Sequence, residues 1–278
     1  MLGGFEVLLP YWLIFYMEIE IMIENVVYLL KFGKRKYIEK FASGILHCSN
    51  AKTFWKIEED KKIKGQGDWL EAGSRIHAQQ LVVKEIGMDR IITTAGKSNV
   101  LVHVESAAEI PVFCLFAVYK DDCVIDDKGD FKICLSEEKK QTIQEHFPEA
   151  DTVAIIKNVD EFLNDVEKSI GYQIKHELVH YFNIDKGYEV NHGQDIANDI
   201  EYYKYVTQDT PPQKVGKYTR LVFNSDYAYR VLFCKDVFFC GEQEYRILLP
   251  FEKINGSKDY PFTSSVEIEV KNIDEFFK

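Results

Sequence analysis

Several signatures of common protein classes are missing from this sequence. No glycine-rich phosphate loop follows a strand-like run, which excludes the P-loop and dinucleotide motifs, and no GxSxG nucleophile elbow occurs. Internal repeats and low-complexity tracts are also absent. The apolar stretch at residues 4–16 is about a dozen residues long, too short to span a bilayer. Because Pro10 interrupts it and no Lys or Arg precedes it, we expect neither a signal peptide nor a membrane partner.

Cysteine is sparse, and none of its spacings matches a CxxC pair or a metal finger. Several cysteines lie inside apolar, strand-like runs such as residues 112–116. This placement predicts buried free thiols in a reducing compartment, and hence a cytoplasmic location, with a disulfide set as the alternative. The six positions are Cys48, Cys114, Cys123, Cys134, Cys234 and Cys240.

The composition is that of a globular chain with an acidic surplus. Its 278 residues are 46% hydrophobic and 14% aromatic, enough for a packed core, and the formal net charge is −11. This charge argues against broad affinity for nucleic acid or anionic membranes. One basic cluster spans residues 31–40 and fits either a local nucleic-acid contact or a solvated charged surface.

Regular patterning begins near Asn25. We interpret residues 1–24 as an N-terminal extension of uncertain status, either a pendant strand or a segment upstream of the true start, and residues 25–278 as one domain. Hairpin-like spacing outnumbers strand-helix-strand units, which predicts an α+β fold with a bent, mostly antiparallel split sheet and a few helices. We expect strands at 26–33, 45–49, 91–94, 100–104, 112–119, 152–156, 172–184, 231–239 and 266–270, helices at 35–41, 136–147 and 160–170, and a surface loop at 58–75.

The stretch from Phe238 to Leu249 is predicted to be the strand around which the chain is organised. With a period of two, one face is apolar and the other carries Glu242, Glu244 and Arg246. Two carboxylates on one face can bracket a small group, and the guanidinium can hold that group or tune their charge. The alternative is a solvated face with ordinary charge pairing.

Residues 176–180 match the HExxH pattern, in which two His one helical turn apart bind zinc. From Tyr172 to Ile184, however, apolar and polar residues alternate almost strictly, which is typical of a strand. On a strand His176 and His180 would lie roughly 13 Å apart, too far to share one zinc ion. A zinc metallopeptidase is therefore the third hypothesis for this chain, and no metal site is predicted.

Four segments together resemble ADP-ribosyltransferase-type bacterial toxins and their relatives in toxin-antitoxin and phage-defence systems. The resemblance covers residues 25–250 and rests on the order and spacing of short motifs. These are the opening strand 28–33, residues 45–55 with Phe54-Trp55, the Gly-Asp-Trp-Leu-Glu run at 67–71, and residues 235–246 with their Glu-Gln-Glu-Tyr-Arg core.

The resemblance implies an NAD site between two bent sheets, with Glu244 as the catalytic Glu and Glu242 as the upstream member of a Glu-x-Glu pair. Lys31 and Ser49 would occupy the first- and second-strand positions of the cofactor site. Asp68 and Glu71 would belong to a loop bordering the cleft. Two departures stand out: Lys31 replaces the usual Arg or His, and no Ser-Thr-Ser triplet follows Ser49.

In this interpretation Glu244 binds a ribose hydroxyl and favours an oxocarbenium-like state, and Glu242 orients or deprotonates the nucleophile. Lys31 would hold the diphosphate or adenosine side. Tyr28, Phe54 or Trp55 would stack on a ring, with core packing as the alternative for each.

The leading hypothesis is thus a toxin or antiviral defence effector that transfers ADP-ribose from NAD to RNA, DNA or protein. Such an enzyme implies an antitoxin partner. The second hypothesis is a non-catalytic relative that binds a nucleotide or a partner protein in the same cleft.

Overall fold

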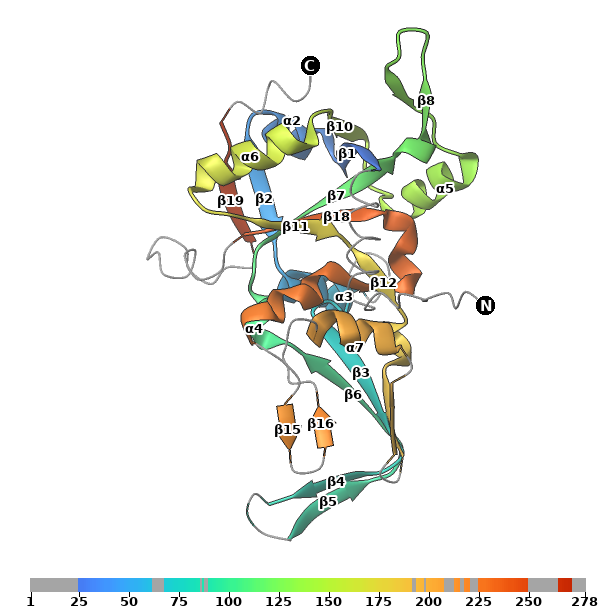
Figure 1. Cartoon of the computed structure of the whole chain (residues 1–278), viewed down its shortest axis with the longest axis vertical. Helices are drawn as coiled ribbons and strands as arrows, with labels where there is room; N and C mark the ends of the chain where they lie inside the picture. The colour runs from blue at the N-terminus through green and yellow to red at the C-terminus, as the bar shows by residue number, and fades with distance from the viewer. Residues whose placement is uncertain are drawn as a thin grey trace, which may run out of the picture.

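A curled antiparallel sheet forms the centre of the molecule (Figure 1). The computed structural model describes residues 25–61, 68–85, 87, 90–191, 194–197, 199–207, 213–215, 218–220, 225–249 and 265–271. The strand order in this sheet is β10-β1-β7-β18-β11, and β2 joins β7 at one end and pairs with β19. The strands are β1 (Val26–Gly33), β2 (Ile45–Ser49), β7 (Val112–Tyr119), β10 (Thr152–Ile156), β11 (Lys175–Leu178), β18 (Glu244–Leu248) and β19 (Ser265–Glu269).

Helices α2 (Arg35–Ala42) and α6 (Val159–Ile170) pack on one face of this sheet. Their buried residues, among them Phe41 and Phe162, join the strand residues in one hydrophobic core because the apolar positions of α6 recur at helical spacing. The Asn158 side chain caps the N-terminus of α6. Gly171 ends the helix in the left-handed conformation, at φ 74°.

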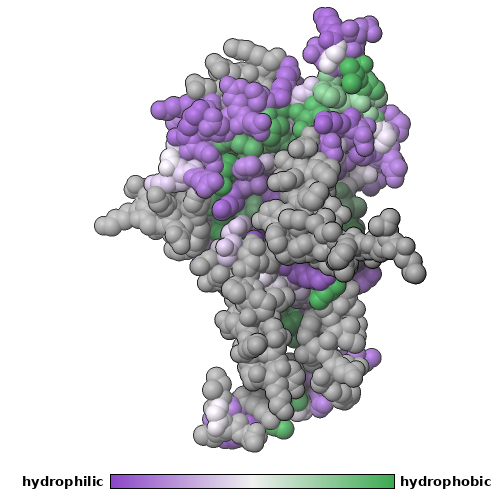
Figure 2. Space-filling view, in the orientation of Figure 1, coloured by the Kyte–Doolittle hydropathy of each residue, from purple (hydrophilic) through white to green (hydrophobic). Residues whose placement is uncertain are grey.

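The opposite face of β1 and β7 carries a smaller apolar cluster that includes Phe116 and Ile143. Over it lie helix α5 (Glu137–His146) and the hairpin of β8 (Cys123–Ile125) and β9 (Phe131–Ile133), which follows the 3-10 helix η1 (Lys120–Asp122). Ser136 caps α5 through its side chain. Figure 2 shows apolar residues below the tip of this hairpin, where Val124 and Ile125 are exposed, whereas most of the described surface in that view is hydrophilic.

A second core lies below the main sheet in Figure 1. It includes residues from a four-stranded sheet of order β14-β13-β3-β6 and from several short helices. The ribbon of β4 and β5 extends to the far end of the long axis. The elements of this part are α3 (Ala51–Lys61), β3 (Gly73–Ala78), β4 (Leu81–Lys84), β5 (Ile91–Ala95), β6 (Ser98–His103), α4 (Glu105–Ala108), η2 (Ile184–Lys186), β13 (Tyr188–Asn191), β14 (Gln194–Ala197), α7 (Ile200–Thr207), β15 (Gln213–Val215), β16 (Tyr218–Arg220) and η3 (Ser225–Phe233).

A parallel pair joins the two parts. Strand β12 (His180–Phe182) pairs with β17 (Cys234–Asp236), and the 3-10 helix η4 (Val237–Glu242) leads from β17 towards β18. None of the described helices is both long and apolar enough to cross a membrane.

The predicted α+β class and the curled antiparallel sheet are confirmed. The predicted strands at 26–33, 45–49, 112–119 and 152–156 have the predicted bounds, and the three predicted helices are present. The extension at residues 1–24 lies outside the described residues.

Four predicted elements are wrong in part. Residues 231–239 are not one strand, because most of them lie in the 3-10 helices η3 and η4. Val231, Leu232 and Phe233 of η3 pack in the second core. The stretch from Phe238 to Leu249 becomes a strand only at Glu244. The run from Tyr172 to Ile184 is split into β11 and β12, and the described start of the expected loop at 58–75 belongs to helix α3.

Candidate functional site

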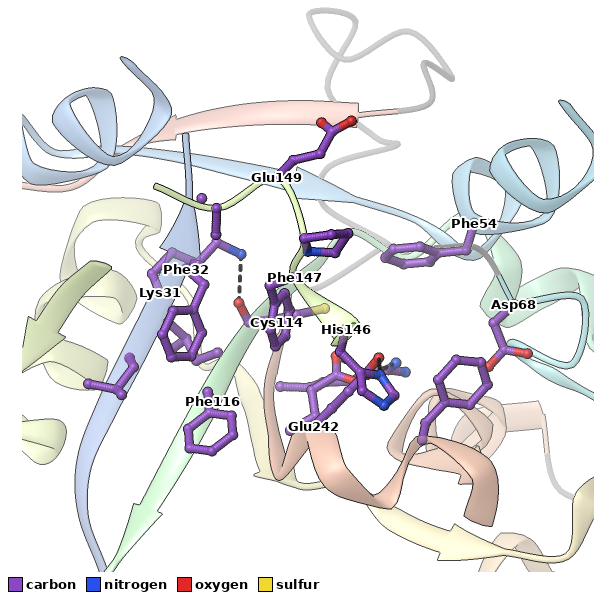
Figure 3. A pocket seen from close by; sticks show the side chains of 18 of the residues that line it. Lys31, Phe32, Phe54, Asp68, Cys114, Phe116, His146, Phe147, Glu149 and Glu242 are labelled. Atoms are coloured by element: carbon purple, nitrogen blue, oxygen red, sulfur yellow. Dashed lines mark hydrogen bonds and ion pairs between the residues drawn. The ribbon is translucent and has the colours of Figure 1, made fainter. Parts of the chain in front are cut away.

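A pocket of about 450 Å³ opens between the main sheet and the second core. This volume is usual for a small-molecule site. Figure 3 shows Lys31 and Phe32 on β1 at one side and Phe54 and Asp68 at the other, with His146 and Glu242 between them. The charged cluster, defined here as Asp68, Glu71, Lys235, Glu242, Glu244 and Arg246, lines one region of the pocket, and all six residues are buried.

Strand β18 brings two members of the charged cluster into the pocket. It lies between β7 and β11, and all five of its residues are buried. Tyr245 and Ile247 point into the main core, so that Glu244 and Arg246 occupy the opposite face, as the period of two predicts. The solvated alternative is wrong, because Arg246 is only 1% exposed.

Gln243 makes the turn from η4 into β18. It adopts a left-handed conformation at φ 41°, which is unfavourable for a residue with a side chain. Its side-chain amide donates to the carbonyl of Ala117 at 2.9 Å and to Asp122 at 3.2 Å. The backbone N–H of Ala117 in turn donates to the carbonyl of Gln243. These bonds hold the strained residue in place and fix the directions of Glu242 and Glu244.

Glu71 and Asp68 come from a tight turn before β3. The turn contains the second described non-glycine residue with positive φ, Ala72 at φ 53°. Trp55 of α3 donates its indole N–H to the carbonyl of Glu71 at 2.8 Å. The carbonyl of Ala72 accepts from the N–H of Val104 at 2.8 Å. Ala72 and Gln243 are thus each next in sequence to a glutamate of the pocket. Strained backbone of this kind is typical of functional sites.

Arg246 uses all five of its N–H donors. Nη1 and Nη2 donate to the two carboxylate oxygens of Glu71 at 2.5 and 2.9 Å. Nε and Nη2 donate to the two oxygens of Glu244 at 2.8 and 3.1 Å, and Nη1 also donates to the carbonyl of Leu232. Such bidentate pairs combine charge with fixed geometry. Arg246 therefore ties the turn before β3 to the central sheet.

Lys235 forms the second cationic centre of the pocket. Its Nζ lies 2.5 Å from Oε2 of Glu242 and 3.3 Å from Oε2 of Glu244, and 4.2 Å from the ring centre of Phe239. The other oxygen of Glu242 lies 3.1 Å from Nδ1 of His146. Both oxygens of Glu242 thus have partners within the protein.

The electrostatics of the charged cluster keep Glu244 ionised. Burial opposes ionisation, but the positive charges of Arg246 and Lys235 outweigh it and lower the pKa of Glu244. Burial likewise lowers the pKa of Lys235, and Glu242 and Glu244 reverse this and raise it. Burial and the charge of Glu244 raise the pKa of the Cys114 thiol well above its usual value, so Cys114 remains a protonated neighbour of Glu244.

Asp68 differs from the other carboxyl groups of the charged cluster. Its Oδ1 accepts from the N–H of Leu70 at 2.8 Å. Its Oδ2 is the one buried side-chain oxygen or nitrogen among the described residues without a hydrogen-bond partner. Burial and the nearby charge of Glu71 raise its pKa to about 7, although Lys235 and Arg246 act in the opposite direction.

The remainder of the pocket wall combines aromatic rings with two lysines. Phe32 and Phe147 stack with ring centres 5.2 Å apart, and Phe54 lies across the pocket from them (Figure 3). Lys31 donates to the carbonyl of Cys114 at 2.6 Å, and Lys34 forms an ion pair of 2.8 Å with Glu149. The pocket therefore has apolar, cationic and carboxylate-rich regions.

Four of the six site residues predicted from the sequence line this pocket: Lys31, Glu242, Glu244 and Arg246. Tyr28 and Ser49 are not among its lining residues. The hydroxyl of Tyr28 donates to the carbonyl of Phe131 at 2.7 Å, at the turn end of the β8–β9 hairpin. Ser49 lies at the end of β2, opposite Val112 and Ser265. Asp68 and Glu71, expected on a loop bordering the cleft, do line the pocket.

Sequence reasoning missed Lys235, His146 and Cys114. Lys235 carries a signal in retrospect, since it is a lone cation between two apolar runs. His146 sits at the end of an otherwise polar helix, and Cys114 was assigned only to the core. Nothing local marks either as a pocket residue, because their partners lie 96 and 130 positions further along the chain.

The HExxH residues lie on strands, as predicted. His176 of β11 shares a hydrogen bond of 2.7 Å with the hydroxyl of Tyr245, whereas His180 of β12 pairs with Glu177 at 2.7 Å. No group of three or more His, Cys, Asp or Glu residues suited to a metal ion occurs in the described part of the chain. The zinc peptidase hypothesis therefore gains no support from the geometry.

Comparisons with known proteins give no family for this chain. Protein-family models, curated proteins and solved structures each yield no match.

Proposed function

We propose that the pocket binds NAD and that the chain transfers ADP-ribose from it to a macromolecular acceptor. The observation that carries the proposal is the charged cluster at one end of an aromatic-walled pocket of about 450 Å³. The three glutamates of this cluster outnumber its one Arg and one Lys, so that this region of the pocket carries an excess of negative charge.

The residues present suit such a ligand. Lys31 and Lys34 line the pocket and provide cationic groups for a diphosphate, and the rings of Phe54 and Tyr37 provide apolar surface for a base. Asp68 lines the same cavity, and its Oδ2 has no hydrogen-bond partner. These groups come from β1, α2, α3 and the turn before β3.

NAD supplies a bond between nicotinamide and ribose whose cleavage develops positive charge on the sugar. Glu244, held ionised by Arg246 and Lys235, stabilises that charge at a fixed position with no reorganisation at the moment of reaction. Glu242 adds a second negative charge and is oriented by Lys235 and His146. The hydrogen bonds of Gln243 fix the positions of Glu242 and Glu244 relative to each other.

The acceptor and the biological setting follow from the same proposal. The basic cluster at residues 31–40 overlaps α2, whose residue Tyr37 lines the pocket and is 58% exposed. This arrangement favours a nucleic-acid acceptor over a protein one. An enzyme of this kind damages the cell that makes it. The proposed role is a cytoplasmic toxin or defence effector controlled by an antitoxin protein.

The test is incubation of the purified protein with labelled NAD and a cell extract, followed by RNase or protease treatment of separate samples. We expect label in a macromolecule and release of nicotinamide. Glu244→Gln preserves shape and removes charge, and should lower the rate about 100-fold or more. Glu137→Gln, on the exposed face of α5, is the matched control and should retain full activity. Equal rates for wild type and Glu244→Gln would refute the role of Glu244.

A second candidate function is non-catalytic binding of a nucleotide. It is favoured by the saturation of Glu244, whose oxygens accept from Arg246 and lie near Lys235. In that case calorimetry would detect NAD binding to both wild type and Glu244→Gln, and no nicotinamide would be released by either.

A further inference from the structure

We propose that Asp68 is the residue that takes the proton from the acceptor nucleophile, a role that rests on the function proposed above. A general base must offer an oxygen that is within hydrogen-bond reach of the reacting group and is not already committed to a neighbour.

The three glutamates of the charged cluster do not meet this condition. Both oxygens of Glu71 accept from Arg246. Both oxygens of Glu244 accept from Arg246 as well. Glu242 uses one oxygen for Lys235 and the other for His146. Each of these three carboxylates is therefore engaged by its neighbours at both oxygens.

Asp68 has an oxygen that is not committed to a neighbour. Its Oδ1 is anchored by the N–H of Leu70, which fixes the plane of the carboxyl group, and Oδ2 has no partner. The residue lines the same pocket as Glu242 and Glu244. An unpaired buried oxygen costs free energy unless a ligand or water satisfies it, so its retention in a pocket points to a use during binding or reaction.

The surroundings of Asp68 also give its carboxyl group a pKa suited to a general base. The charged groups that face Asp68 are Glu71 from its own turn, Lys235 from β17 and Arg246 from β18. Burial and Glu71 place its pKa at about 7, near the pH at which a general base both ionises and retains basicity. Glu244, with its lowered pKa, is a poor proton acceptor.

The step balances without an added oxidant or reductant. Asp68 Oδ2 takes the proton of the acceptor O–H or N–H group as the acceptor atom bonds to C1′ of the ribose. The electron pair of the broken bond between C1′ and nitrogen leaves with nicotinamide. Asp68 then releases the proton to solvent, which restores its ionised form.

The experiment compares wild type, Asp68→Asn and the control Asp127→Asn, which lies in the exposed β8–β9 turn. Nicotinamide release and transfer are measured between pH 5.5 and 9. We expect wild-type kcat/KM to rise with pH through an apparent pKa of about 7. We expect Asp68→Asn to lose about 100-fold at pH 8 and to lose this pH dependence, with NAD affinity retained. The control should follow the wild type.

Two further readouts separate catalysis from structure. Added formate should restore part of the activity of Asp68→Ala, because a small carboxylate can occupy the space left by the side chain. In a protein with ¹³C-labelled aspartate carboxyl groups, the signal absent from the Asp68→Asn spectrum should titrate near pH 7 without any substrate. A signal titrating near pH 4 overturns the proposal.

Failure of the proposed function and failure of the role of Asp68 give different results. A wild-type protein that neither releases nicotinamide nor transfers label overturns the proposed function and the role of Asp68 together. A wild type that is active, with an Asp68→Asn variant of equal rate and equal pH profile, overturns only the role of Asp68.

Discussion

Replacing Asp68 by Asn should stabilise the protein at alkaline pH much more than at acidic pH. Asp68 is 5% exposed, and its pKa rises from 3.8 in an ordinary environment to about 7 in the folded state. A carboxyl group whose pKa is raised in the folded state contributes its full stability below the unfolded-state pKa, where it is protonated in both states. Its contribution to stability is lost as pH rises from the unfolded value to the folded one.

The magnitude follows from the size of the shift. One pKa unit corresponds to about 1.4 kcal/mol, so a shift from 3.8 to about 7 corresponds to a loss on the order of 4 kcal/mol at pH 8 relative to pH 3.5. Asn has the shape of Asp, keeps an oxygen for the N–H of Leu70 and does not titrate. The difference in unfolding free energy between Asp68→Asn and wild type should therefore grow by this amount between pH 3.5 and pH 8.

Urea unfolding followed by tryptophan fluorescence at several pH values measures this difference. Taking the difference between variant and wild type cancels the titration of other groups, such as Glu244, which both proteins share. Asp127→Asn, in the exposed β8–β9 turn, should show an almost constant difference across the range. A constant difference for Asp68→Asn as well would refute the assignment of a raised pKa to Asp68, and with it the electrostatic reasoning about the pocket.

Two further predictions concern other contacts. Arg246→Met leaves Glu71 and Glu244 buried without their guanidinium partner and should lower the unfolding free energy, measured by urea titration, by about 3–5 kcal/mol. Adding Glu244→Gln to this variant should recover part of the loss. A loss below about 1 kcal/mol for Arg246→Met would contradict the proposed geometry. Gly187→Ala would place a Cβ 1.9 Å from the carbonyl oxygen of Arg75 and should lower Tm strongly. Gly129→Ala is the control: its positive φ costs about 1 kcal/mol, but its Cβ would meet nothing within 4 Å, so its loss in Tm should be much smaller. Equal losses in Tm would speak against the close approach of Gly187 to Arg75.

The sequence predicts those parts of the fold in which local pattern and burial agree. The bounds of β1 and β7 follow from continuous apolar runs, and α6 follows from its helical spacing and its cap. The faces of β18 were also predicted correctly, because its alternation is intact. Helix η4 was missed because its Val-Phe-Phe-Cys run has the composition of a strand.

The candidate site is less predictable for a physical reason. Glu244 and Arg246 could be placed together from their spacing on one strand. The bidentate pair of Arg246 with Glu71 joins residues 175 positions apart and depends on the tertiary fold alone. The left-handed conformation of Gln243 is likewise imposed by its bonds to Ala117 and Asp122, since no local preference of Gln favours it.

The pairing of Arg246 with Glu71 also has a consequence for synthesis on the ribosome. The turn before β3 is made early, but its carboxylate has no guanidinium partner until β18 has left the exit tunnel. Domains are made from the N-terminus at about 5–20 residues per second, so roughly ten seconds or more separate the two partners. During that interval the charged cluster is incomplete, because it still lacks Arg246. Any chemistry of this pocket is thus withheld until β18 has been made.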